Sequence, residues 1–155
     1  MEKQDNPGVR FPPPLMFFLS GLAGWFIGSR FGILTFEQVI ITDIFGLILA
    51  VLGFLLGFWS MLPFLAAKTS MLPWTSDSKL LVGGPYKFSR NPMYAGMALI
   101  YTGIGVLLGS GLVIVLLAPL IFIMNRYVIA QEEAYLSREF GDEYLEFMQK
   151  VRRWL

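Results

Sequence analysis

Long uncharged stretches of hydrophobic residues alternate with shorter charged segments along the chain. Residues 11–29, 44–67 and 91–125 contain no Asp, Glu, Lys or Arg. A helix needs about 20 apolar residues to cross the hydrocarbon core of a membrane, and the first two stretches approach or exceed this length. Each predicts one membrane-spanning helix, and Pro63 near the end of the second indicates a kink or an exit at the interface.

The third uncharged stretch is too long for a single crossing. At about 1.5 Å per residue it would extend roughly 50 Å as one helix. Gly109, Ser110 and Gly111 supply a natural turn, because glycine adopts unusual backbone angles at little steric cost. The pattern therefore predicts an all-α integral membrane protein of about four transmembrane helices, the last two forming a helical hairpin. The expected spans are residues 12–30, 42–66, 92–108 and 112–130.

The tail, residues 131–155, is charged but keeps apolar residues at helical spacing. These positions are Leu136, Phe140, Tyr144, Phe147, Val151 and Trp154 or Leu155. The spacing predicts an amphipathic helix that lies along the membrane surface. Gly141 followed by Asp142 indicates a helix stop and a new start, so the tail is expected to form two short helices. The length of 155 residues favours a single domain over residues 1–155.

Small residues recur at four-residue spacing inside the uncharged stretches. They are Ser20, Gly24 and Gly28, then Gly53 and Gly57, then Gly105 and Gly109. In lipid, such residues let two helix backbones approach closely. We therefore expect these positions to serve helix packing rather than ligand binding.

The basic residues predict how the chain is oriented in the membrane. Of the 12 Lys and Arg residues, 11 lie before the first span, between the second and third spans, or after Asn125, and only Arg30 lies on the other side. The positive-inside rule then places both termini and the active site on the cytoplasmic side of a multi-pass protein.

Composition narrows the chemistry further. The chain is 55% hydrophobic and 15% charged, which agrees with lipid as its solvent, and its net charge of +1 gives no reason to expect nucleic acid as a partner. It has no cysteine and no histidine, so zinc sites built on these residues and Ser-His-Asp triads are excluded. No metal site is expected, and any chemistry must use Arg, Lys, Tyr, Asn and carboxylates.

The hairpin should bring two polar segments together at the cytoplasmic interface. In an antiparallel pair, the start of the first arm, residues 90–94, lies beside the end of the second, residues 126–133. Taken one at a time, these residues have ordinary structural explanations: Asn91 and Pro92 suit a helix start, and tyrosines anchor helices at the interface. Together they offer carboxylates, arginines and aromatic rings, a mixture that suits S-adenosylmethionine.

Two ordered motifs carry a resemblance to a known family. The first is Gly-Pro-Tyr-Lys-Phe-Ser-Arg-Asn-Pro-Met-Tyr-Ala-Gly at residues 84–96, and the second is Glu132-Glu133 followed by Phe-Gly-Asp-Glu-Tyr at residues 140–144. In this order, after a hairpin, they resemble the isoprenylcysteine carboxyl methyltransferase family, which shares much of the pattern with phospholipid methyltransferases. The resemblance covers roughly the C-terminal half of the chain and implies binding of S-adenosylmethionine at the cytoplasmic face.

The resemblance also implies which residues contact the cofactor and the acceptor. The cofactor-binding residues are expected to be Leu81, Val82, Tyr86, Asn91, Pro92, Met93, Tyr94, Glu132 and Glu133. Asn91 stands where the family usually has histidine, and it can still donate and accept hydrogen bonds but cannot become a cation. A basic residue that contacts substrate in the eukaryotic enzymes corresponds to Val128 here, with Arg126 two residues away. Arg90 and Arg126 are expected to orient the acceptor.

Three functions follow from these expectations. The first is methyl transfer to a lipophilic carboxylate of an isoprenylcysteine-like compound, which is ionised at neutral pH and needs no general base. The second is N-methylation of a phospholipid amine, where Glu132, Glu133 or Tyr94 would have to accept a proton. The third, from another class, is a non-enzymatic membrane scaffold in which the motif residues serve only as interfacial anchors.

Overall fold

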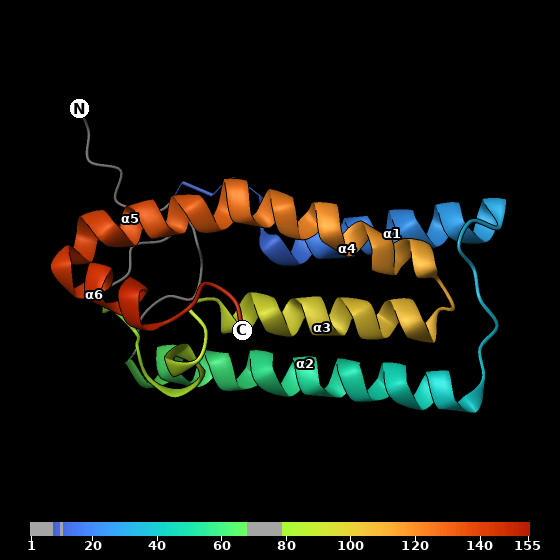
Figure 1. The fold of residues 1–155 in the computed structure, drawn as a ribbon, viewed down its shortest axis with the longest axis horizontal. Coiled ribbons are helices and arrows are strands. Elements are labelled where there is room, and N and C mark those ends of the chain that lie inside the picture. The colour runs from blue at the N-terminus through green and yellow to red at the C-terminus, as the bar shows by residue number, and fades with distance from the viewer. Residues whose placement is uncertain (1–7, 10, 68–78) are drawn as a thin grey trace.

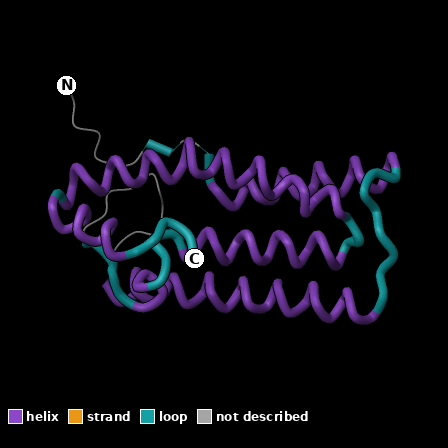
Figure 2. Tube along the Cα trace, in the orientation of Figure 1, coloured by secondary structure: helices purple, strands orange, loops and turns teal. Residues whose placement is uncertain are grey.

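A computed structural model describes residues 8–9, 11–67 and 79–155, and they form an elongated helical bundle (Figure 1). The helices are α1 (Pro13–Phe31), α2 (Ile40–Ala67), the 3-10 turn η1 (Gly84–Lys87), α3 (Pro92–Leu107), α4 (Gly111–Ile123), the π-helical η2 (Met124–Ile129), α5 (Ala130–Phe140) and α6 (Asp142–Lys150). Within these residues an isolated bridge between Thr35 and Ser110 is the only β-type pairing, and Figure 2 shows helices and loops alone. The all-α expectation is confirmed.

Helices lie at all four positions where the hydropathy pattern predicted spans. Two helical stretches, Ile40–Ala67 and the continuous run Gly111–Phe140, are long and apolar enough to cross a membrane. Helix α3 is apolar but has 16 residues. That α1 and α3 also cross the bilayer stays a prediction. The first ten residues and residues 68–78, which carry part of the expected cytoplasmic charge, fall mostly outside the described residues.

The hairpin turn between α3 and α4 lies where glycine predicted it. Gly109 has φ +61°, a left-handed conformation that favours glycine. The hydroxyl of Ser110 then caps α4 by accepting the amide N–H of Val113 at 3.4 Å. The loop after α1 is tied to the same turn, since Gly111 N–H donates to the carbonyl of Leu34 at 2.7 Å. The hairpin is confirmed, and a backbone hydrogen bond ties its turn to the loop after α1.

The second hairpin arm does not end near residue 130 as expected. Helix α4 passes through the π-helical segment Met124–Ile129 directly into α5, so the interfacial part continues the arm rather than following it. The physical reason is that the charged residues after Ala130 are good helix formers and give the backbone no cause to stop. The stop comes at Gly141, with φ +54°, where the break predicted between two tail helices is confirmed.

Small residues hold α2 and α3 close together, as expected in lipid. A Cβ added to Gly53 would come within 2.6 Å of the Gly96 carbonyl oxygen, and one added to Gly103 within 2.6 Å of the Gly46 carbonyl oxygen. Figure 1 shows α2 running alongside α3, with α1 and α4 on the opposite side of α3. This arrangement sets the start of α3 inside the end of the bundle where α5 and α6 lie.

Candidate functional site

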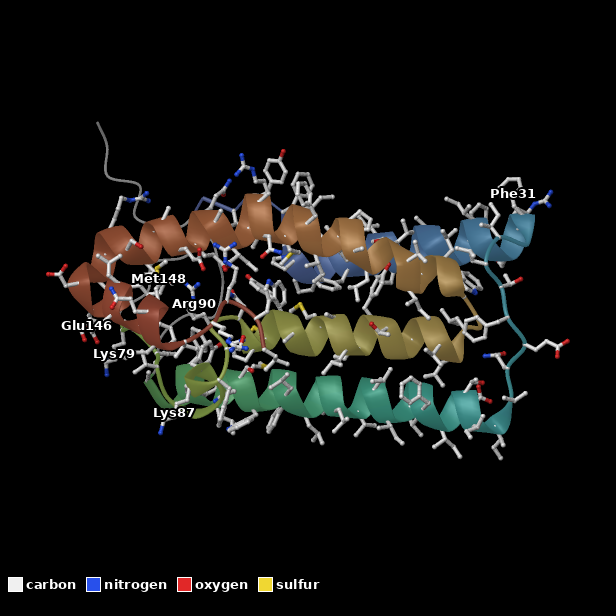
Figure 3. The ribbon with its side chains drawn as sticks, viewed as in Figure 1. Phe31, Lys79, Lys87, Arg90, Glu146 and Met148 are labelled. Atoms are coloured by element: carbon white, nitrogen blue, oxygen red, sulfur yellow. The ribbon has the colours of Figure 1, made fainter. Side chains whose placement is uncertain are left out.

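The polar residues of both motifs meet at one end of the bundle. There the start of α3, the helices α5 and α6, and the C-terminal segment (residues 151–155) come together. Figure 3 shows Arg90 in the interior of this end, whereas Lys79, Lys87 and Glu146 lie on its outside. The juxtaposition that the hairpin geometry predicted is therefore present.

Tyr94 and Glu132 form the contact between the two hairpin arms. Tyr94 lies in the first turn of α3 and is buried, and its hydroxyl donates a hydrogen bond to Glu132 Oε1 at 2.5 Å. Glu132 lies in the first turn of α5, directly after the π-helical segment. Such segments are short, and they often occur at functional sites. Here the segment precedes the residue that faces Tyr94.

Glu133 is the acidic centre of an adjacent ion-pair cluster. Arg90 Nη1 lies 2.8 Å from Glu133 Oε1, and only 10% and 12% of the two side chains is exposed. Arg153 Nε donates to Glu133 Oε1 at 3.0 Å, and its Nη2 contacts Oε2. Buried charges are tolerated when they are paired in this way. Arg90 Nε is buried with no hydrogen-bond partner among the described residues, and the Arg90 side chain also interacts with Tyr144.

The C-terminal segment closes over the turn that precedes α3. The backbone N–H of Arg90 donates to the Arg152 carbonyl at 2.8 Å. The Arg153 carbonyl accepts from Ser89 Oγ at 3.2 Å and from Asn91 Nδ2 at 3.0 Å. Sequence reasoning missed this role of Arg152 and Arg153, because nothing in a basic C-terminal tail predicts which carbonyls it presents.

Asn91 is the N-cap of α3 but does not cap it with its side chain. The expectation of an Asn cap is wrong in this respect, because the amide is used in the bond to the Arg153 carbonyl. Pro92 occupies the first helical position, as expected. A second bond anchors the C-terminal segment farther along, where Trp154 Nε1 donates to Asn125 Oδ1 at 2.9 Å within the π-helical segment.

An aromatic cluster borders the ion pairs. It consists of Tyr86, Tyr144 and Phe147, with Phe64 packed edge-on against Tyr86 at 5.9 Å between ring centroids. Burial, reinforced by the charge of Glu133 and opposed by Arg90, raises the pKa of Tyr144 to about 12. Tyr144 is thus a neutral phenol at physiological pH and links the cluster to the ion pairs. Sequence reasoning assigned it to an amphipathic face rather than to the site.

The other residues expected at the site differ in how deeply they are buried. Pro92 and Tyr86 are buried, Leu81 and Met93 are half-buried, and Val82 is exposed. Of the two arginines expected to orient an acceptor, Arg90 is inside the site, whereas Arg126 is exposed and makes no ion pair within the described residues. The structure therefore does not join these two arginines in one contact.

Comparison with known proteins agrees with this arrangement. Residues 41–143 match the sequence profile of the family described as phospholipid methyltransferase. An uncharacterised protein of Haemophilus influenzae is 43% identical over 63 residues, which cover 41% of this chain and all of that protein. The profile match extends from the start of α2 into α6 and includes the first motif and all of the second except Tyr144. The chain belongs to the phospholipid methyltransferase family.

Proposed function

We propose that this protein is an S-adenosylmethionine-dependent methyltransferase that acts on a lipophilic acceptor at the cytoplasmic face of a membrane. Membership of the family supports methyltransferase activity, and the two helices long enough to span support a membrane setting. The observation that carries the proposal is the Tyr94–Glu132 hydrogen bond beside the Arg90–Glu133 ion pair. A scaffold needs only interfacial anchors and has no reason to place two half-buried acidic residues side by side.

The residues present fit the proposed cofactor. Its charged end carries an amino group and a carboxylate, and the buried, unpaired Nε of Arg90 suits the carboxylate. The carboxylate of Glu132 suits an amino group or a ribose diol. Tyr86 and Tyr144 are buried in the aromatic cluster, so they form the wall behind the ion pairs rather than an open surface for the adenine ring. When bound, the cofactor supplies an electrophilic methyl group on sulfur.

The protein's own contribution is to position the acceptor against the cofactor and to exclude water from the site. Methyl transfer needs the acceptor held in line with the methyl group at near-attack distance. The ties from the C-terminal segment to Ser89 and Asn91 and from Arg153 to Glu133 fix the walls of the site. Glu133 is neutralised by two arginines, whereas Glu132 is held by the Tyr94 hydroxyl, and we assign cofactor binding or proton uptake to Glu132.

The first candidate acceptor is the carboxylate of an isoprenylcysteine-like compound. It is ionised at neutral pH and reacts without a base, which suits a chain that lacks histidine. Support comes from the motif resemblance and from Arg126, whose exposed cation lies on the segment leading into the site.

The second candidate is the amine of a phospholipid, and one observation favours it. An ammonium must lose a proton before it can attack, and the carboxylate of Glu132, held by Tyr94, is the group best placed to receive it. The description of the matching family also names phospholipids as its substrates. The bilayer itself would then supply the acceptor.

Product chemistry distinguishes the two acceptors. The purified full chain is incubated with methyl-tritiated S-adenosylmethionine and either N-acetyl-S-farnesylcysteine or phosphatidylethanolamine vesicles. A methyl ester releases volatile tritiated methanol in base, whereas an N-methyl group does not. Volatile label with the farnesyl compound supports the first candidate, and stable lipid-bound label supports the second. No transfer to either compound, by protein that also fails to bind S-adenosylhomocysteine, contradicts the proposed function.

A further inference from the structure

The helix that carries Glu132 contains one irregular turn, which directly precedes the candidate site. The π-helical segment Met124–Ile129 joins α4 to α5 without a break. A π-helical bulge accommodates one residue more than the α-helix around it, and it is usually a single turn long. Each α-helical residue rotates the chain by about 100°, so the position of the extra residue decides which side chains after it face the core.

The buried side of this segment directs Glu132 towards the site. Val128 and Ile129 are 2% and 0% exposed, and they belong to the same core cluster as Tyr94. Glu132 follows Val128 by four positions and Ile129 by three, so it lies on the same helix face one turn later. If the extra residue came after Glu132 instead of before it, this side chain would be rotated by about 100° from its place beside Tyr94. The Tyr94–Glu132 hydrogen bond therefore depends on where the bulge lies.

A side chain from the C-terminal segment holds the bulge. Trp154 Nε1 donates to Asn125 Oδ1 at 2.9 Å, and the two residues are 29 positions apart. Within the described part of the chain, this is the one side-chain hydrogen bond to Met124–Ile129. The indole also packs against the core cluster that contains Tyr94. Trp154 is thus placed to keep the extra residue ahead of Glu132.

The residue before Trp154 holds the helix on the other side of Glu132. Arg153 Nε donates to Glu133 at 3.0 Å, and the Arg153 carbonyl accepts from Ser89 and Asn91. Two successive residues therefore contact the helix before and after Glu132. Because the same segment is fastened to the turn before α3, these contacts set α5 against α3.

We propose that Trp154 is a positioning residue of the methyltransferase site. Its bond to Asn125 fixes the π-helical turn ahead of Glu132 and so holds the Glu132 carboxylate against Tyr94. This assignment rests on the function proposed above. A tryptophan that served only as an interfacial anchor would direct its indole N–H towards the lipid headgroups. The N–H of Trp154 is instead satisfied inside the protein.

Hydrogen exchange tests this contact without any ligand. Amide exchange of the detergent-solubilised full chain is followed by mass spectrometry for the wild type, Trp154→Phe and Trp25→Phe. The phenyl ring at position 154 keeps most of the packing but has no hydrogen-bond donor. Trp25 on α1 is the matched control, because its indole makes no hydrogen bond within the described residues.

The expected change is local to the bulge and to the start of α5. Residues 124–133 should exchange at least about fivefold faster in Trp154→Phe, as expected for the loss of one neutral hydrogen bond, and at the wild-type rate in Trp25→Phe. Unchanged exchange of residues 124–133 in Trp154→Phe overturns the proposal. An equal rise throughout α3 also overturns it, because the substitution would then loosen the whole bundle.

Cofactor affinity tests whether Trp154 acts through Glu132. Trp154→Phe should weaken S-adenosylhomocysteine binding about fivefold. Asn125→Leu, which removes the acceptor, should have the same effect, and the double variant should bind no more weakly than either single variant. In the Glu132→Ala background, Trp154→Phe should cause no further loss.

Two binding results would overturn the proposal. One is an additive loss in the double variant, which would mean that Trp154 and Asn125 act separately. The other is the same loss from Trp154→Phe with and without Glu132, which would mean that Trp154 acts by another route. Failure of the wild type to bind S-adenosylhomocysteine defeats the proposed function instead, and the exchange pattern still decides whether Trp154 holds the bulge.

Discussion

The side chain of Arg153 pairs with that of Glu133, which lies 20 positions earlier in the sequence. Its Nε donates to Oε1 at 3.0 Å, and its Nη2 contacts Oε2. The same residue's carbonyl accepts from Ser89 and Asn91, so one residue ties α5 to the turn before α3. The C-terminal segment thereby becomes part of the site rather than a trailing end. The contribution of the Arg153 side chain can be separated from that of the segment's positive charge, because the neighbouring Arg152 offers a control substitution.

Replacing Arg153 by Ala should weaken S-adenosylhomocysteine binding by about tenfold. Hydrogen bonds to charged groups are worth about 1.5–3 kcal/mol, and the 38% exposure of the Arg153 side chain places it at the low end of that range. Arg152→Ala is the matched control, because the structure uses the carbonyl of Arg152 rather than its side chain. Isothermal titration of both variants checks the prediction. Equally weakened binding in both variants would show that the segment acts through its positive charge rather than through the Arg153–Glu133 contact.

Gly53→Ala should destabilise the bundle, whereas Gly57→Ala on the same helix should not. The added Cβ at Gly53 would lie within 2.6–2.8 Å of α3 atoms, but at Gly57 it would meet nothing within 4 Å. Overpacking typically costs about 1–3 kcal/mol. Thermal unfolding in detergent should show a Tm lower by several degrees for Gly53→Ala and near the wild-type value for Gly57→Ala. An unchanged Tm for Gly53→Ala would mean that α2 and α3 are not in close contact at this position.

Stability should fall at high pH, and Tyr144 should account for part of the fall. Burial raises the pKa of its phenol from the usual value near 10 to about 12, so the folded state holds this proton more tightly than the unfolded chain. Its stabilising contribution is complete below pH 10 and is lost as pH rises through about 12. Tm measured from pH 8.5 to 12 should fall more steeply for the wild type than for Tyr144→Phe. Parallel curves would refute the assignment.

The proposed orientation can be tested with single cysteines, because the chain contains none. Glu37 lies in the loop between α1 and α2, and Glu146 lies on α6 at the opposite end of the bundle, and both are exposed. In intact cells, a membrane-impermeant maleimide should label Glu37→Cys, whereas Glu146→Cys should react only after permeabilisation. The reverse pattern would place the site on the outer side.

Hydropathy and turn chemistry were enough to predict the four helix positions and the hairpin. Both signals are local: uncharged length gives the helices, and Gly109 gives the turn through its positive φ. The passage of α4 into α5 was not predictable, because a change from apolar to charged residues marks a change of solvent and not a helix end. Gly141 did mark the end, through backbone geometry.

The site was predictable only as far as the hairpin dictates it. Antiparallel arms must bring Tyr94 near Glu132, and the structure places them in hydrogen-bond contact. The roles of Arg153 and Trp154 depend on how the chain folds back after α6, for which the sequence carries no periodic signal. Asn91 likewise has a local explanation as a cap, but a distant carbonyl takes its side chain instead.

Calorimetric titration with S-adenosylhomocysteine tests directly whether Glu132 forms part of a cofactor site. Three detergent-solubilised proteins are compared: the wild type, Glu132→Ala, and Glu139→Ala, which removes an exposed carboxylate from the same helix. We expect saturable binding by the wild type and Glu139→Ala, and binding at least about tenfold weaker for Glu132→Ala, since losing a charged hydrogen-bond acceptor costs about 1.5–3 kcal/mol. Absence of binding by folded wild-type protein, or equal affinity in all three, would contradict it.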